Sequence, residues 1–154
     1  MTLSRVSAAL AHDLGRSQFI ALVYAVFDPR SGRLRLANAG QLEPILVRGR
    51  QIRYLATPGE RLPLGLGVER RYDELMIDLQ PGDRVLFYTD GVLEAQNVSG
   101  ELFGFERLEA LLRRLNPGAD AIERLRRDLS RFTNGIGPAD DVTVVELAMT
   151  VPDR

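Results

Sequence analysis

One candidate for chemistry is Asp90, which follows a short run of β-branched and aromatic residues. That run, Arg84–Tyr88, predicts a strand covered on both faces. A carboxylate at the end of a buried strand is costly unless a cation meets it. Gly91, which comes next, lets another backbone approach closely because it has no Cβ. The simpler interpretation is that Asp90 only caps a turn.

A second acidic motif stands before another strand-like run. Asp140 and Asp141 lead into Val142–Leu147, and two adjacent carboxylates repel each other unless they share a cation. Carboxylate oxygens at loop–strand junctions suit hard divalent ions such as Mg²⁺ or Mn²⁺. The two motifs together make Asp90, Asp140 and Asp141 candidate metal ligands.

The residues around both motifs resemble the PPM-type metal-dependent serine/threonine protein phosphatases. The resemblance is to the bacterial branch typified by the sporulation phosphatase SpoIIE and by the RsbU-like phosphatases of partner-switching systems. It covers nearly the whole chain, and the motifs occur in the family's order. They are FIALVYAVFDPRSGRLRLANAG at 19–40, LPLGL at 62–66, PGDRVLFYTDGVLEAQN at 81–97, GELFG at 100–104 and ADDVT at 139–143.

The resemblance implies a binuclear Mn²⁺ or Mg²⁺ centre that activates water for attack on phosphorus. It assigns Asp90 and Asp140 as ligands, with Asp141 as a further ligand or the hydrogen-bonded neighbour of one. Thr89 and Gly91 are structural residues beside the site, and no catalytic residue is implied beyond the metal ligands. The implied substrate is a phosphoserine or phosphothreonine protein, in this branch an anti-sigma-factor antagonist, with a sensor or receiver domain as a possible upstream partner.

Two departures from the family pattern favour an alternative. The family's earlier motif, Gly-Asp-x-x-Gly-His-Gly, carries the aspartate that bridges both metals, and nothing in Met1–Phe19 resembles it. The family commonly has histidine where this chain has Gln41. We therefore expect an N-terminally truncated domain that is inactive or nearly inactive by itself. The alternative is a catalytically inactive binding module that keeps the fold. A structural Ca²⁺ site is disfavoured because no loop has the dense ligand spacing of such sites.

The pattern of apolar residues predicts one α+β domain over residues 1–154. The resemblance sharpens this to a phosphatase β-sandwich flanked by helices, with its N-terminal strands missing. The outer faces of the two later helices carry Arg with Glu and Asp, which predicts solvated faces, with an Arg-rich docking surface as the alternative. The expected strands are 18–27, 33–37, 44–47, 51–55, 75–79, 84–88 and 142–147, and the expected helices are 3–14, 105–115 and 122–132.

Composition excludes several classes of protein. The net charge is −1 and all 20 basic residues are arginine, so no polyanion-binding footprint predicts a nucleic-acid partner. The absence of cysteine excludes disulfides, thiolate metal sites and a cysteine nucleophile. The longest apolar run, Phe19–Phe27, is too short to span a membrane. No secretory signal is visible, so the expected location is cytoplasmic, without a membrane partner.

Overall fold

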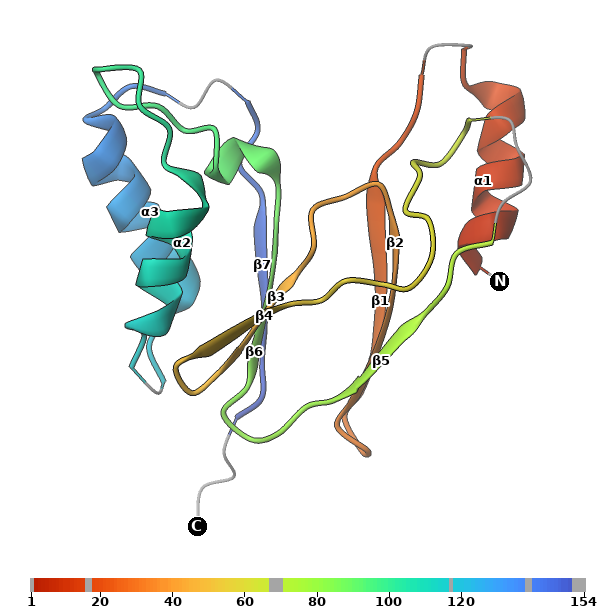
Figure 1. Ribbon diagram of the computed structural model, residues 1–154, viewed down its shortest axis with the longest axis horizontal. Coiled ribbons are helices and arrows are strands. Elements are labelled where there is room, and N and C mark those ends of the chain that lie inside the picture. Colours follow the sequence, from red (N-terminus) through yellow and green to blue (C-terminus); the bar gives the residue numbers. More distant parts are fainter. Residues whose placement is uncertain (1, 16–17, 67–70, 117, 138–139, 151–154) are drawn as a thin grey trace. The chain divides into compact units, whose positions relative to one another are not determined.

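The computed structural model describes residues 2–15, 18–66, 71–116, 118–137 and 140–150 (Figure 1). The chain divides into two compact units, Met1–Glu43 with Leu55–Gln80 and Pro44–Tyr54 with Pro81–Arg154. The described residues form two antiparallel sheets and three α-helices, which confirms the predicted α+β class. That they act as one domain stays a prediction.

The first unit contains a three-stranded sheet in the order β1-β2-β5. The elements are α1 (Thr2–Asp13), β1 (Leu22–Asp28), β2 (Arg33–Ala39) and β5 (Leu75–Asp78). Side chains of the central strand β2 alternate between two faces, as strand geometry requires. Leu34 and Leu36 are buried on one face. On the other face, Ala37 and Ala39 form a core cluster with Leu3 of α1, together with Leu64 and Tyr72.

The first strand differs from its prediction. It begins at Leu22 rather than near residue 18, and Ile20 makes only an isolated bridge to Leu64. Leu22, Tyr24 and Val26 are exposed although they are apolar. Leu22 and Tyr24 lie opposite Ala39 and Ala37 and share their face of the sheet, but the core cluster on that face includes no described residue of β1. The packing layer therefore does not extend over this edge strand. A continuous apolar run therefore did not mean burial on both faces here.

The second unit contains a four-stranded sheet in the order β4-β3-β6-β7. Its strands are β3 (Ile45–Arg48), β4 (Gln51–Tyr54), β6 (Arg84–Tyr88) and β7 (Val144–Ala148). Val85 and Leu86 of β6 point to opposite faces of the sheet and are both buried, which confirms the prediction of a strand covered on both sides. All pairings are antiparallel, and Phe87 of β6 lies opposite Val145 of β7.

Two helices cover one face of this sheet, α2 (Gly104–Arg113) against β4 and α3 (Ala121–Thr133) against β7. The N-terminus of α3 is capped by Asp120, whose Oδ1 accepts a 2.8 Å hydrogen bond from the Glu123 amide. Its C-terminus ends at Asn134, in the left-handed conformation with φ +50°. No helix among the described residues has the length and apolar character needed to cross a bilayer.

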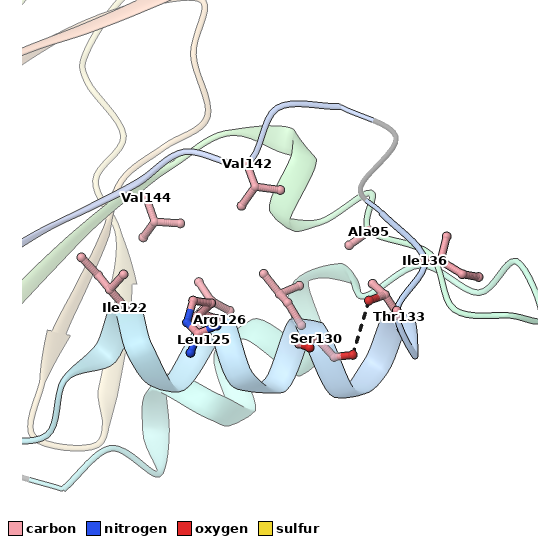
Figure 2. Close-up of a pocket in the computed structure, with 11 residues that line it drawn as sticks. Ala95, Ile122, Leu125, Arg126, Ser130, Thr133, Ile136, Val142 and Val144 are labelled. Atoms are coloured by element: carbon pink, nitrogen blue, oxygen red, sulfur yellow. Dashed lines mark hydrogen bonds between the residues drawn. The ribbon is translucent and has the colours of Figure 1, made fainter.

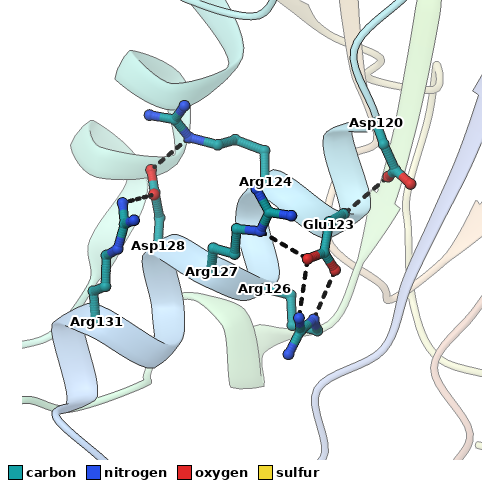
Figure 3. Close-up of polar contacts among 7 residues, drawn as sticks. All are labelled: Asp120, Glu123, Arg124, Arg126, Arg127, Asp128 and Arg131. Atoms are coloured by element: carbon teal, nitrogen blue, oxygen red, sulfur yellow. Dashed lines mark hydrogen bonds and ion pairs between the residues drawn. The ribbon is translucent and has the colours of Figure 1, made fainter.

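The outer face of α3 is a ladder of ion pairs (Figure 3). Glu123 accepts hydrogen bonds from Arg126 and Arg127, which lower the pKa of its carboxyl to about 2. Asp128 pairs with Arg124 at 3.3 Å and with Arg131 at 3.8 Å. The arginines are exposed, as predicted, whereas Glu123 and Asp128 are half-buried between them. Such pairs near the surface contribute little to stability. A docking role for this face stays a prediction.

A better buried ion pair joins β3 to the turn before β6. Asp83 is 2% exposed, and both of its carboxylate oxygens accept hydrogen bonds from Arg48, at 2.9 Å from Nε and 2.6 Å from Nη2. The two parallel bonds match the planar fork of the guanidinium.

We expect Arg48→Met to lower the free energy of unfolding by about 2–3 kcal/mol, because it leaves the Asp83 carboxylate buried without its main cation. Chemical denaturation measures this. Arg50→Met, at an exposed position in the neighbouring turn, is the matched control and should change stability by less than ~0.5 kcal/mol. Equal effects of the two substitutions would contradict this account of the pair.

Candidate functional site

Asp90 lies where β6 ends and the chain turns into the short 3₁₀ helix η1 (Asp90–Val92). Its Oδ1 accepts a 3.1 Å hydrogen bond from the Gly91 amide, and its carbonyl accepts from the amides of Leu93 and Glu94. The side chain is exposed, so the expectation that it carries a burial cost is wrong. The strand is buried up to Tyr88, but Asp90 follows its end and reaches solvent because the chain leaves the sheet at this point.

Thr89 connects the Asp90 corner to the second acidic motif. Its hydroxyl donates a 2.8 Å hydrogen bond to the carbonyl of Asp141 and accepts a 3.0 Å bond from the amide of Thr143. Its own amide donates to the Thr143 carbonyl at 3.1 Å. Three hydrogen bonds therefore hold the end of β6 against the segment that enters β7.

Gly91 is buried against the same segment. A Cβ at this position would lie 2.5 Å from the carbonyl oxygen of Asp141 and 3.2 Å from that of Asp140. Both are backbone atoms, so no side-chain movement could relieve the clash. The close backbone approach expected from the glycine is present, and it is an approach to the other acidic motif.

The three candidate ligands therefore come from two segments that are in direct backbone contact. Asp140 and Asp141 are exposed, and Oδ1 of Asp140 accepts a 2.7 Å hydrogen bond from the Asp141 amide. Carboxylate oxygens are the donors that Mg²⁺ and Mn²⁺ prefer. However, no group of three or more His, Cys, Asp or Glu side chains in the described part of the chain is placed to hold a metal ion. The donor chemistry fits a divalent ion, but these carboxylates do not complete a site by themselves.

Gln41 lies in the first unit and closes a turn. Its amide donates to Oδ1 of the buried Asn38 at 2.8 Å, and its carbonyl accepts from Nδ2 of the same residue at 2.9 Å. Its side-chain oxygen accepts a 2.9 Å bond from the amide of Leu42. Gly40 between them has φ +82° and packs on Pro63. The Asn-Ala-Gly-Gln sequence thus has a structural role that its turn residues indicate.

A cavity beneath α3 was not predicted from the sequence. It is lined by side chains from α3, from the segment around Ala95 and from Val142 and Val144. These segments are far apart in the chain, and helical periodicity marks the α3 residues only as core. No local sequence signal could have identified the cavity.

Comparison with known proteins identifies the class of protein to which this fold belongs. Two antiparallel sheets with helices match phosphatase domains of the PP2C type. Residues 1–150 match the family model of stage II sporulation protein E (SpoIIE), so the chain belongs to this family of PPM-type phosphatases, as the resemblance implied.

Individual relatives are longer than this chain. Protein IcfG of Synechocystis is 28% identical over 131 residues, which cover 84% of this chain and 20% of IcfG. The SiaA PP2C domain of Pseudomonas aeruginosa has a TM-score of 0.71 at 20% identity, covering 96% of this chain and 68% of that one. The manganese-presoaked SpoIIE phosphatase domain of Bacillus subtilis has a TM-score of 0.64 at 15% identity, covering 87% and 58%.

We expect Gly91→Ala to destabilise the second unit by about 2 kcal/mol, because the new methyl group overlaps the backbone of Asp140 and Asp141. Gly137→Ala is the matched control, since nothing lies within 4 Å of a Cβ there. Denaturant unfolding compares the two variants. Equal stability of both would show that the backbone contact is looser than described.

We expect Thr89→Val to cost about 1–2 kcal/mol, because it removes two hydrogen bonds of the hydroxyl while keeping the shape of the side chain. Thr89→Ser keeps the hydroxyl and should recover most of that loss. Thermal unfolding with hydrogen exchange at the Thr143 amide measures the effect. Unchanged exchange at Thr143 in Thr89→Val would contradict the bridging role.

Proposed function

We propose that the complete domain to which this chain belongs hydrolyses phosphoserine or phosphothreonine on a protein, in a metal-dependent reaction. One observation carries the proposal. In a chain of the SpoIIE family, the corner that bears Asp90 contacts the backbone of Asp140 and Asp141 through Thr89 and Gly91. The pairing of β6 with β7 brings these two acidic segments together, and a cation shared between them requires the segments to be neighbours.

In this proposal Asp90 and Asp140 are metal ligands, and Asp141 is a further ligand or orients one. Support comes from their exposed carboxylates and from oxygen-ligand chemistry. The SpoIIE phosphatase-domain structure that this fold resembles was presoaked in manganese. Divalent ions, Mn²⁺ or Mg²⁺, when bound would supply an activated water and screen the phosphoryl charge.

The residues of this chain have positioning roles in the proposed site. The Thr89 hydroxyl fixes the Asp141 carbonyl, so the loop cannot move away from the end of β6 without losing a hydrogen bond. Gly91 allows the two backbones to touch. Because the water would be the nucleophile, no cysteine or serine–histidine pair is needed.

The proposed substrate is an anti-sigma-factor antagonist of a partner-switching pathway, and the proposed regulator is an upstream sensor or receiver domain. Both rest on membership of the SpoIIE family. The chain covers 20% of IcfG, and that relative has ample length for further domains.

A second candidate is a binding module without catalysis. It is favoured by the lack of a three-ligand cluster among the described side chains and by Gln41 in its turn. A binding module would hold a partner equally well with and without EDTA, whereas a metal-dependent site would not.

The test is hydrolysis of a phosphoserine peptide with and without Mn²⁺, by the 154-residue chain and by a longer form that includes any upstream coding sequence. We expect at most trace activity from the chain alone. In the longer form, Asp90→Asn should reduce turnover by on the order of 100-fold or more, beyond the usual effect of losing a neighbour of a ligand. Glu94→Gln, an exposed acid one turn away, is the control. Full activity of Asp90→Asn would refute the proposed metal site.

A further inference from the structure

A short hairpin, residues 95–103, extends directly from the corner that bears Asp90, and we call it the corner hairpin. Just before it, the amide of Glu94 donates a 2.9 Å hydrogen bond to the Asp90 carbonyl. Its two arms are joined by a 2.8 Å bond from the Phe103 amide to the Ala95 carbonyl. In Figure 1 the hairpin leaves the end of the sheet at which β6 ends and β7 begins. It therefore lies at the same end of the second unit as the proposed site.

Side chains of the hairpin and of α2 hold its shape. Oδ1 of Asn97 accepts hydrogen bonds from the amides of Ser99 at 3.0 Å and Glu101 at 2.9 Å. The guanidinium of Arg107 donates hydrogen bonds to the Glu101 carboxylate and to the Leu102 carbonyl. Because these bonds already restrict both arms, a partner that binds the hairpin has little conformational freedom left to remove.

Aromatic contacts attach the hairpin to the end of α3. Phe103 meets Phe132 edge to face, with ring centroids 5.4 Å apart, and the Arg107 guanidinium lies 4.7 Å from the centroid of the Phe132 ring. At the start of the hairpin, Ala95 lines the cavity beneath α3 together with Val142, the residue after the second acidic motif (Figure 2). The hairpin is therefore anchored on one side to the acidic corner and on the other to α3.

The tip of the corner hairpin presents an apolar side chain to solvent. Among the described residues, Val98 is the most exposed large apolar side chain, at 69%. The tip residues 97–100 carry no ionisable group, in a chain of which 27% is charged. A single exposed apolar residue is common on protein surfaces. On a loop that is held rigid beside a proposed reaction site, however, it can bind a partner at a small cost in ordering entropy.

We propose that the corner hairpin is a specificity-determining contact for the protein substrate of the proposed reaction, and this inference rests on the proposed function. The tip binds an uncharged, apolar surface beside the phosphorylated residue. At about 3.3 Å per residue, the tip lies roughly 10 Å beyond Ala95. A phosphoprotein, or a peptide with several residues on each side of the phosphoserine, reaches this contact, whereas a small phosphate ester does not.

The charges of the hairpin favour an apolar protein surface over other partners. A phosphate group or an acidic surface needs a cation, and Arg107 already pairs with Glu101. A basic surface needs acidic side chains, and the tip residues have none. A small molecule needs a concave pocket that covers most of its surface, whereas Val98 projects into solvent.

The test compares three substrates of the longer form of the protein: p-nitrophenyl phosphate and two eleven-residue peptides with a central phosphoserine. The third to fifth positions on each side of the phosphoserine are leucine in one peptide and serine in the other. We expect KM for the leucine peptide to be lower by about fivefold or more, with similar kcat. Val98→Asp should abolish this difference in KM and leave the hydrolysis of p-nitrophenyl phosphate unchanged.

Two further variants are the controls. Val98→Ile keeps the tip apolar and should keep the preference for the leucine peptide. Gln51→Asp adds the same charge at an exposed position at the other end of the sheet, where β3 turns into β4, and should have no effect. Equal KM for the two peptides, or a leucine preference that survives in Val98→Asp, would overturn the inference.

Binding separates this inference from the proposed function. Fluorescence anisotropy of the two peptides, labelled with fluorescein, measures their binding to the 154-residue chain in EDTA and needs no turnover. If the longer form hydrolyses none of the three substrates, the proposed function is wrong and binding decides the inference. Tighter binding of the leucine peptide that Val98→Asp abolishes would then support the docking surface, and equal binding of both peptides would overturn it.

Discussion

The candidate site depends on the contact between the end of β6 and the segment that enters β7. Three hydrogen bonds involving Thr89 and the missing Cβ of Gly91 bring the two backbones together. Because β6 and β7 are neighbours in the sheet, the end of one and the start of the other meet without long-range packing. The sheet sets where the acidic residues lie, and the threonine and glycine set how closely their loops approach.

The arrangement of this sheet also explains which apolar side chains remain exposed. α2 packs against β4 and α3 packs against β7, so the helices cover the sheet as far as its last described strand. At that strand the apolar layer ends in a groove rather than in a closed core. The exposed apolar residues of β7 and α3 thus lie along one edge of the sheet. The loop that carries Asp140 and Asp141 leads into the strand at that edge.

The family and the fold do not by themselves determine the chemistry. A fold can be kept while activity is lost, since function depends on the site rather than on the scaffold. Here the scaffold brings two acidic segments together, yet the described side chains form no group of three that could hold a metal. In the proposed reaction, the remaining metal ligands come from residues outside this arrangement.

The sequence by itself determined the α+β class, most strand and helix positions, and the family, because periodicity and turn residues act locally and the motifs are contiguous. It also singled out the two acidic motifs. It predicted wrongly that Asp90 carries a burial cost and that the first strand begins near residue 18. Only the tertiary structure decided that Gly91 touches Asp141, that β1 and β7 are edges, and that a groove lies beneath α3. Those features depend on which segments of the chain become neighbours in the fold. A local sequence pattern does not show which residues will lie opposite it.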